Sequence, residues 1–336
     1  MIMKKTFFVL LLVIAISFMH KGSTFAADDV IKLKIGNVVN EGHSYIVAER
    51  WMAEELKKRT NGRLELEIYT ANQLGNERDM YEGVQMGSID ICTIADSVLT
   101  SFIPEVMVLN QPFLFNSEAE VYAVLYKRLY KMIGEKMLGQ GVHLVGCLGS
   151  GFRNVYSKRP ITKIEDFKGM KLRTMENQLQ VSTWNAIGLI ATPLPFGEVF
   201  TAMQQGAIDG AEGPVINMLI DGNHEITKHL VYTNHLYTIM FIGVSDRAWN
   251  RIPDDLKPIF QQVMDEGTEL QHKLVVELNE DAIEKLKDLG VTFYDIDRAP
   301  LQKAIVPAMV PFRNNMNKEW LAILEADQAE YRAANP

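Results

Sequence analysis

Two arginines carry the residue type and the setting that recognition of a carboxylate requires. Arg173 stands near the end of the stretch 170–174, which we predict to be a strand. In α/β proteins such strand ends face the ligand crevice. The planar guanidinium offers a fork of donors that matches a carboxylate in two parallel hydrogen bonds. Arg153 lies where we expect the chain to cross between two halves of the molecule. A surface or structural ion pair would explain either arginine without a ligand.

Motifs for catalysis, metals and cofactors were searched for, and none was found. Gly149-Ser150-Gly151 lacks the flanking spacing of a nucleophile elbow. His224 and His229 resemble a zinc-binding helix motif, but side chains at i and i+5 diverge by roughly 140° and do not share one metal ion. No glycine-rich phosphate loop is present. The sequence therefore predicts no catalytic residue, no metal site and no cofactor, although catalytic groups often converge from distant positions.

A short phrase occurs twice, and it indicates two similar halves. Residues 85–90 read QMGSID and residues 204–209 read QQGAID. Each copy closes a helix-like segment at a glycine, which accepts the left-handed backbone that ends a helix, and each leads into a strand-like stretch. Two similar α/β lobes would enclose a cleft, and clefts bind ligands. The phrase is also a common helix–strand connector, and that alternative stays open.

Alternating helix and strand patterns predict the same architecture. The first half reads as strand, helix, strand, helix, strand, an order that implies a parallel sheet: 31–37, 44–60, 63–69, 76–86 and 89–95. The second half repeats it with 170–174, 176–187, 189–192, 196–205 and 208–212. Further strands are predicted at 142–148, 152–157 and 237–244, and a helix at 117–138. A helical stretch from 253 to 289 is long enough to cross both lobes.

The N-terminus has the features of a secretory signal peptide. Lys4 and Lys5 precede an apolar run from 7 to 19, which is too short to span a bilayer, and small residues precede a cleavage site after about Ala26. A buried N-terminal helix is the alternative. We therefore expect the mature protein to be exported. The remaining chain of about 310 residues exceeds one typical core and predicts two domains.

Charge and cysteine content exclude some classes of partner. Residues 1–26 contain three lysines and no acidic residue, so cleavage changes the formal charge from −8 to −11. Such a surface argues against nucleic acid and anionic membranes as partners, but not against an anionic ligand bound by local arginines.

Cys92 and Cys147 lie in strand-like segments. An exported protein can join them, yet we favour free thiols.

Residues 164–177 read IEDFKGMKLRTMEN. This stretch resembles the signature of the DctP family. The members of that family are the periplasmic solute receptors of tripartite ATP-independent periplasmic (TRAP) transporters. Residues 73–75, 110–115, 195–200 and 209–214 resemble the family in the same order. The resemblance implies an α/β, two-lobed periplasmic-binding-protein fold with a long helix spanning both lobes. On that basis we assign residues 27–150 with about 239–278 to lobe I, 151–238 with about 279–306 to lobe II, and 307–336 to a C-terminal helical segment.

The resemblance also implies a function without chemistry. Such a receptor captures a small organic acid by lobe closure and delivers it to integral-membrane TRAP subunits. Asp96 and the two arginines favour a hydroxylated sugar acid, such as a uronate or aldonate. We expect a periplasmic monomer that is not an enzyme. A ligand-binding module of a sensory receptor, or an exported hydrolase or lyase of the same fold, are the alternatives.

The family pattern suggests which residues contact the ligand. Arg173 would clamp the carboxylate, with Arg153 as a second donor. Asp96 would accept hydrogen bonds from ligand hydroxyl groups or an amine, although an N-terminal helix cap explains it equally well. Sialic-acid-binding relatives carry an asparagine where this chain has Gly213, which leaves the ligand unidentified. The remaining candidates are Phe196 as a pocket wall, Glu212 at the end of a strand, and Asn37 and His43 at the cleft lip.

Overall fold

The computed structural model describes residues 30–335, so the predicted signal peptide and its cleavage site after about Ala26 lie outside the described residues. Three parallel strands form the sheet of the first half, here called lobe I: β1 (Ile31–Gly36), β2 (Leu64–Tyr69) and β3 (Ile91–Ala95). The helices between and after them are α2 (Ser44–Arg59), α3 (Glu77–Gln85) and α4 (Asp96–Leu99). In β1, Leu33 and Ile35 are buried while Lys32 and Lys34 are exposed, which is the period-two pattern of a strand.

The second half, lobe II, repeats this arrangement. Its parallel strands are β5 (Lys171–Thr174), β6 (Ile190–Pro193) and β7 (Gly210–Gly213). Its helices are α7 (Gln178–Asn185), α8 (Val199–Gln204) and α9 (Val215–Ile220). Gly87 and Gly206, the glycines of the repeated phrase, have φ values of 72° and 73°. Both glycines therefore end a helix in the left-handed region, as the sequence predicted.

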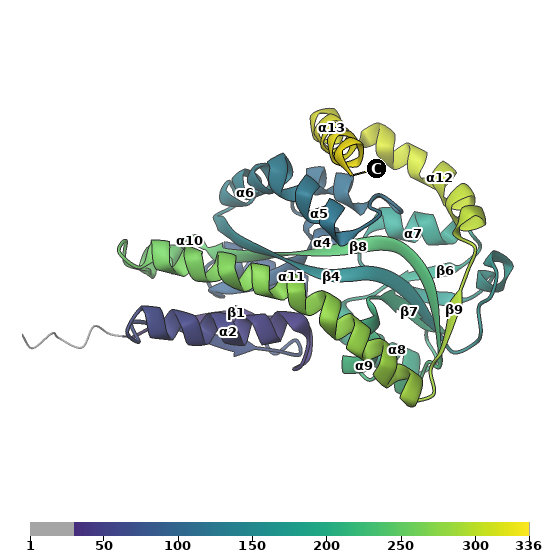
Figure 1. Ribbon diagram of the computed structural model, residues 1–336, viewed down its shortest axis with the longest axis horizontal. Coiled ribbons are helices and arrows are strands. Elements are labelled where there is room, and N and C mark those ends of the chain that lie inside the picture. Colours follow the sequence, from purple (N-terminus) through teal and green to yellow (C-terminus); the bar gives the residue numbers. More distant parts are fainter. Residues whose placement is uncertain (1–29, 336) are drawn as a thin grey trace, which may run out of the picture.

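Two long antiparallel strands join the lobes into one sheet, β4 (Val142–Ser157) and β8 (His229–Ser245). The strand order is β2-β1-β3-β8-β4-β7-β5-β6, and Figure 1 shows β4 and β8 curving from one lobe into the other. The sequence predicted two strands, 142–148 and 152–157, where the structure has only β4. Glycines interrupt the apolar pattern there, and the register shifts between Gly149 and Gly151 and again between Arg153 and Val155. The chain bends at these bulges without leaving the sheet.

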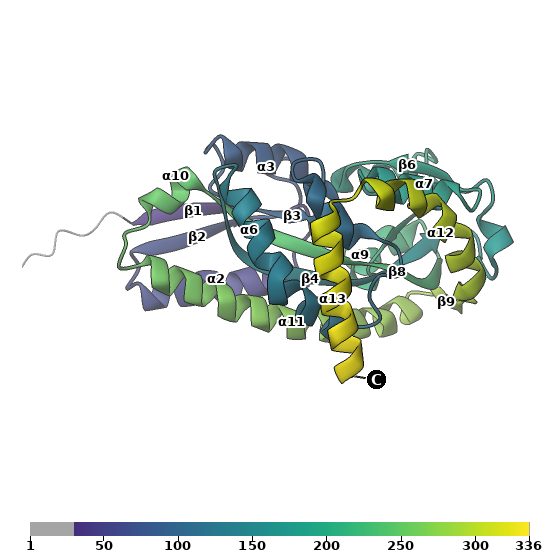
Figure 2. The ribbon, with the colours of Figure 1, turned by 90° about the horizontal axis from the view of Figure 1, so that it is seen from above.

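The helix α11 (Lys257–Asp288) runs along both lobes, as the sequence predicted (Figures 1 and 2). Gln271 donates to Ser44 at the start of α2, and Asn279 accepts from the backbone of Ile216 in α9. One continuous helix is therefore hydrogen-bonded to elements of both lobes.

The remaining helices cover the ends and the faces of the sheet. The helices are α5 (Glu118–Val124), α6 (Tyr130–Leu138), α10 (Asp246–Arg251), α12 (Arg298–Asn315) and α13 (Lys318–Ala334). The strand β9 (Thr292–Asp295) belongs to the sheet itself and pairs in parallel with β8. A π-helical stretch, Leu125–Leu129, links α5 and α6. Short 3-10 helices cover Pro104–Asn110, Ile164–Phe167, Phe196–Glu198 and Asn223–Glu225. The C-terminal α13 returns to lobe I, where Asp327 pairs with Arg128 and Arg332 pairs with Glu120. The residue boundaries assigned to the two lobes from the sequence stay a prediction.

The close contact of α11 with α2 yields a prediction about stability. A Cβ atom at Gly267 would lie 2.3 Å from Cγ of the fully buried Met52. Because overpacking a core forces side chains from their preferred positions, we expect Gly267→Ala to lower the free energy of unfolding by about 1–3 kcal/mol in urea denaturation.

Gly134 in α6 is the matched control, because a Cβ there would meet its nearest atom at 3.5 Å. Gly134→Ala should raise the free energy of unfolding by about 0.4–1 kcal/mol, since alanine reduces the entropy of the unfolded chain. A Gly267→Ala protein as stable as the wild type would contradict the close packing of α2 on α11.

Candidate ligand-binding site between the lobes

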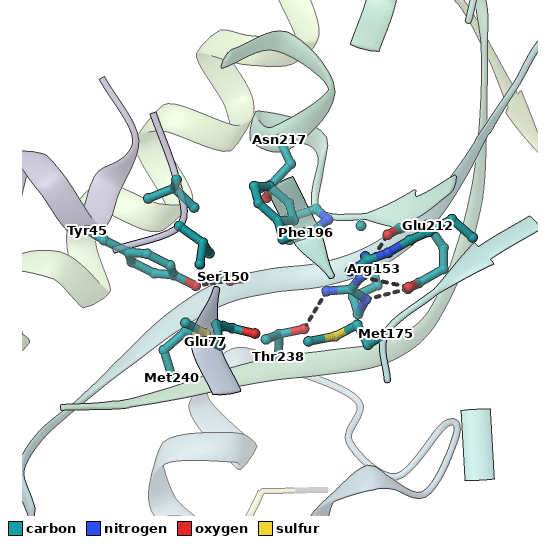
Figure 3. Close-up of a pocket in the computed structure, with 15 residues that line it drawn as sticks. Tyr45, Glu77, Ser150, Arg153, Met175, Phe196, Glu212, Asn217, Thr238 and Met240 are labelled. Atoms are coloured by element: carbon teal, nitrogen blue, oxygen red, sulfur yellow. Dashed lines mark hydrogen bonds and ion pairs between the residues drawn. The ribbon is translucent and has the colours of Figure 1, made fainter. Parts of the chain in front are cut away.

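A pocket lies where the carboxyl ends of the parallel strands of both lobes face each other across β4 and β8. Figure 3 shows its polar side chains converging from opposite sides. Lobe I contributes residues that follow β1 and precede β3, and lobe II contributes residues at the ends of β5 and β7. The polar residues that line the pocket are Tyr45, Glu77, Ser150, Arg153, Arg173, Glu212, Asn217 and Thr238. Strand ends in α/β folds form such crevices because the loops that follow them diverge there.

The guanidinium of Arg153 is held by an acid of its own lobe. Its Nε and Nη2 donate to both carboxylate oxygens of Glu212, with 2.7 Å between Nη2 and Oε1, and Nη2 also donates to the Glu212 carbonyl at 2.7 Å. Its Nη1 donates to Thr238 Oγ1 at 2.9 Å. His235 Nε2 lies 3.2 Å from Glu212 Oε2. Burial by itself would raise the pKa of Glu212, but Arg153 and His235 outweigh burial and hold that pKa well below its usual range. Most donors of Arg153 are therefore engaged within the protein.

Arg173 is equally buried, but among residues 30–335 no acidic side chain pairs with it. Its Nε and Nη2 both donate to the backbone carbonyl of Leu194, at 2.9 and 2.8 Å. No hydrogen bond within the described chain engages Nη1. The side chain is 4% exposed, and burial lowers its pKa. The guanidinium lies 5.9 Å from the ring centre of Phe196. A buried cation without an anionic partner is costly, so this site is suited to a bound anion.

The opposite wall of the pocket carries an acid and two hydroxyl groups. Glu77 is the first residue of α3, and its Oε1 accepts from the Ala95 backbone at 3.2 Å. Burial raises the pKa of Glu77 to about 7. Tyr45 and Ser150 hydrogen-bond to each other through their hydroxyl groups. None of these three residues was predicted from the sequence to contact a ligand. Tyr45 and Glu77 lie inside predicted helices, where core packing explains them, and Ser150 was considered only as a catalytic nucleophile between two predicted strands. Of the three, only Glu77 has a recognisable sequence signal, because it follows the helix-capping Asn76 and therefore lies at the start of a helix.

A chain of hydrogen bonds connects the pocket to the contact between the lobes. Asn217 of α9 lines the pocket and donates to Asp221 Oδ2 at 3.2 Å. Asp221 Oδ1 accepts from Asn40, which follows β1 in lobe I, at 3.0 Å. A pocket residue of lobe II is therefore linked through one carboxylate to lobe I.

The predicted site residues fall into two groups. Arg153, Arg173, Phe196, Glu212 and Gly213 line the pocket. Asn37, His43 and Asp96 lie outside its lining and bond within the protein.

Asn37 donates to both oxygens of Glu49, at 2.9 and 2.7 Å. His43 Nδ1 caps α2 by accepting from the Tyr45 backbone at 3.3 Å, and burial lowers its pKa to about 4. Asp96 begins α4 and accepts from the Ser97 backbone at 2.8 Å, and burial raises its pKa to about 7. The structure contradicts the helix-cap alternative for Asp96, because the N-cap residue of α4 is Ala95 and no side-chain cap hydrogen bond is formed there.

Features that would point to another class of protein were sought in the part of the chain that the structure describes. There, no group of three or more His, Cys, Asp or Glu residues is placed to hold a metal ion. No described helix is both long and apolar enough to cross a membrane. Cys92 and Cys147 are buried free thiols.

Two α/β lobes on shared strands, a spanning helix and a polar pocket between the lobes define a bacterial solute receptor of the periplasmic-binding type. The sequence model of the family "Bacterial extracellular solute-binding protein, family 7" (DctP) matches residues 35–315, and the chain belongs to this family. A solute-binding protein of Verminephrobacter eiseniae is 30% identical over 308 residues, which cover 91% of each chain.

Solved structures of TRAP solute-binding proteins share the fold. One from Polaromonas sp. JS666, bound to D-erythronate, is 32% identical with a TM-score of 0.83, and the match covers 89% of this chain and 98% of that one. A sugar acid binding protein from Advenella mimigardefordensis in complex with galactonate is 26% identical with a TM-score of 0.86, at the same coverage. The two-lobed fold expected from the sequence is confirmed.

The enclosed pair of Arg153 and Glu212 yields a prediction about stability. Glu212→Gln preserves the shape of the side chain but leaves the guanidinium buried and unpaired. We expect the free energy of unfolding to fall by about 3–5 kcal/mol in urea denaturation. The control is Glu41→Gln, because Glu41 pairs with Arg50 at the surface and both side chains are more than half exposed. Losing this ion pair should lower the free energy of unfolding by less than about 1 kcal/mol. Equal losses in the two variants would contradict a structural role for the Glu212 carboxylate.

The buried Glu49 yields a prediction about pH. Burial raises the pKa of Glu49 to about 8. Between pH 5 and pH 8 the unfolded chain therefore loses a proton that the folded protein keeps, and the free energy of unfolding falls as the pH rises, by about 1.4 kcal/mol per unit of pKa difference at most. We expect Glu49→Gln to reduce this fall in urea denaturation at several pH values.

The exposed Glu54, on the same helix, provides the control Glu54→Gln, which should keep the pH dependence of the wild type. The prediction fails if the two variants show the same slope.

Proposed function

We propose that this protein captures a hydroxylated sugar acid by closing its two lobes around the ligand, and that it delivers the ligand to the membrane subunits of a TRAP transporter. The observation that carries the proposal is the unpaired, buried guanidinium of Arg173 at the pocket wall. A ligand carboxylate would supply the missing anion. Charge-assisted hydrogen bonds of this kind contribute about 1.5–3 kcal/mol each.

The remaining polar groups favour hydroxyl groups over a second carboxylate at the other end of the ligand. Glu77, Tyr45 and Ser150 supply acceptors and donors on the lobe I wall. An ionised Glu77 would repel a second carboxylate but would accept a hydrogen bond from a sugar hydroxyl. Three solved structures of similar receptors hold D-glucuronate, β-D-galacturonate and L-fuconate. A relative in sequence, from Rhodobacter capsulatus, is a C4-dicarboxylate-binding protein. The acid on the lobe I wall leads us to place this chain with the sugar-acid receptors.

The mechanism follows from where the two ends of the ligand bind. Arg173 belongs to lobe II, while Tyr45 and Glu77 belong to lobe I, so a ligand that contacts all three stabilises the closed form over an open one. Closure also excludes water and strengthens the ion pair at Arg173. An ion pair and several hydrogen bonds are compatible with a binding free energy of about −8 kcal/mol, which corresponds to a micromolar dissociation constant. The closed form would then be the form that the membrane subunits bind.

The cellular setting is part of the same proposal. The N-terminal segment would direct export and be removed after about Ala26, which leaves a periplasmic receptor. We propose that it acts as a monomer and does not alter its ligand. Incubation with the bound acid, followed by analysis for products, tests the second point, and light scattering tests the first.

Removing the guanidinium of Arg173 tests the carboxylate clamp. We expect Arg173→Ala to weaken binding of the tightest-binding acid at least tenfold in isothermal titration calorimetry, because the ligand carboxylate loses its main counter-charge. Suitable acids are D-glucuronate, D-galacturonate, galactonate, L-fuconate and D-erythronate. Succinate should bind more weakly than the best of them.

The matched control is Arg50→Ala, because Arg50 pairs with Glu41 at the surface, away from the pocket. This variant should bind like the wild type. Unchanged affinity in Arg173→Ala would rule out the clamp, and a wild-type protein that bound succinate more tightly than all five sugar acids would contradict the assignment of the ligand class.

A further inference from the structure

A tyrosine hydroxyl lies beside the candidate site without a hydrogen-bond partner among the described residues. Tyr156 stands near the end of β4 and is 2% exposed. Its ring packs in the apolar cluster of lobe II that includes Ala211, Val215 and Ile216. Within residues 30–335 its hydroxyl makes no hydrogen bond, yet it is not among the fully enclosed polar atoms that lack partners. The hydroxyl therefore keeps a small accessible surface.

The sheet register directs this side chain toward the pocket. Tyr156 is paired with Ala211 of β7, and Ala211 is paired with Arg173 of β5. Side chains at paired positions of neighbouring strands project from the same face of a sheet. Arg173 on β5 and Tyr156 on β4 therefore project from the same face of the sheet, and β7 lies between these two strands. Gly213 lies two residues beyond Ala211 and projects the same way.

Gly213 provides the space that the hydroxyl occupies. A Cβ atom at Gly213 would lie 2.7 Å from the Tyr156 hydroxyl oxygen. Gly213 is itself a lining residue of the pocket. Tyr156 is not itself among the residues that line the pocket, and its hydroxyl lies directly behind Gly213, where a side chain at position 213 would begin. Any larger residue at 213 would force the tyrosine to move.

The electrostatic setting favours donation to an anion. Burial raises the pKa of Tyr156, so the phenol keeps its proton at physiological pH. Arg153 and Arg173 act to lower that pKa and the carboxylates of Glu212 and Asp221 act to raise it, but within residues 30–335 the hydroxyl donates to neither carboxylate. Neither arginine accepts a hydrogen bond, so the phenol proton needs an acceptor from elsewhere. Leaving such a buried hydroxyl without a partner is unfavourable.

We propose that the Tyr156 hydroxyl is a further ligand-binding group, which donates a hydrogen bond to the carboxylate that Arg173 binds. Gly213 is the companion residue that gives the hydroxyl access to the pocket. The inference rests on the proposed function, because it assigns one more donor to the same carboxylate. It makes Tyr156 a determinant of affinity for acids, although the ring belongs to the core of lobe II.

The test is Tyr156→Phe, which removes only the hydroxyl and keeps the ring in its cluster. Calorimetry with the tightest-binding of the five sugar acids should show about a tenfold loss of affinity, which corresponds to about 1.4 kcal/mol. Urea denaturation without ligand should show no loss of stability, because the hydroxyl has no partner within the described protein. A purely structural role would reduce stability and not affinity.

Tyr232→Phe is the matched control, because Tyr232 also packs at the apolar cluster of lobe II but stacks on Phe293 and is not among the nearest neighbours of Gly213. It should bind the acid like the wild type. Wild-type affinity in Tyr156→Phe would overturn the role of Tyr156 and leave the proposed function intact. A wild-type protein that binds none of the five acids would overturn both.

Discussion

The binding site depends on the different partners of two buried guanidinium groups. Arg153 faces Glu212 within lobe II, so its charge is neutralised inside the protein. Arg173 has only the backbone carbonyl of Leu194 as a hydrogen-bond partner in the described chain. Water does not screen a charge in this position, so the pocket has an excess of positive charge when it is empty. The unpaired arginine makes the cleft suited to an anion, and the paired arginine gives it a rigid wall.

The fold places these groups with few connecting elements. The strands β4 and β8 belong to both lobes, and α11 is hydrogen-bonded to both. The lobes are therefore joined by ordered structure, and β4 carries bulges along its crossing from one lobe to the other. Arg153 lies at one of these bulges. The same irregularity that lets the strand pass between the lobes thus turns a donor toward the pocket.

The two walls of the pocket offer different kinds of interaction, positive charge on one side and hydrogen-bonding groups on the other. The cationic side belongs to lobe II, and the lobe I wall presents Glu77, Tyr45 and Ser150. The ligand that we propose, with one carboxylate and several hydroxyl groups, would satisfy both walls at once. The hydrogen bonds from Asn217 through Asp221 to Asn40 extend this arrangement to the contact between the lobes. Ligand contact and lobe contact are therefore physically connected in lobe II.

The sequence by itself determined the two α/β halves and the long helix, and it predicted the arginine at the end of β5 that we propose to bind a carboxylate. Periodicity and the repeated phrase with Gly87 and Gly206 are local signals, because helix ends and strand faces depend on residues near in the chain. Only the tertiary structure decided which polar residues meet in the pocket. Asn37 and Glu49 are twelve residues apart and satisfy each other, whereas Glu77 and Arg173 lie far apart in the chain and line one cleft. A side chain is free for a ligand only if no distant residue satisfies it, and this pairing becomes visible only after the chain has folded.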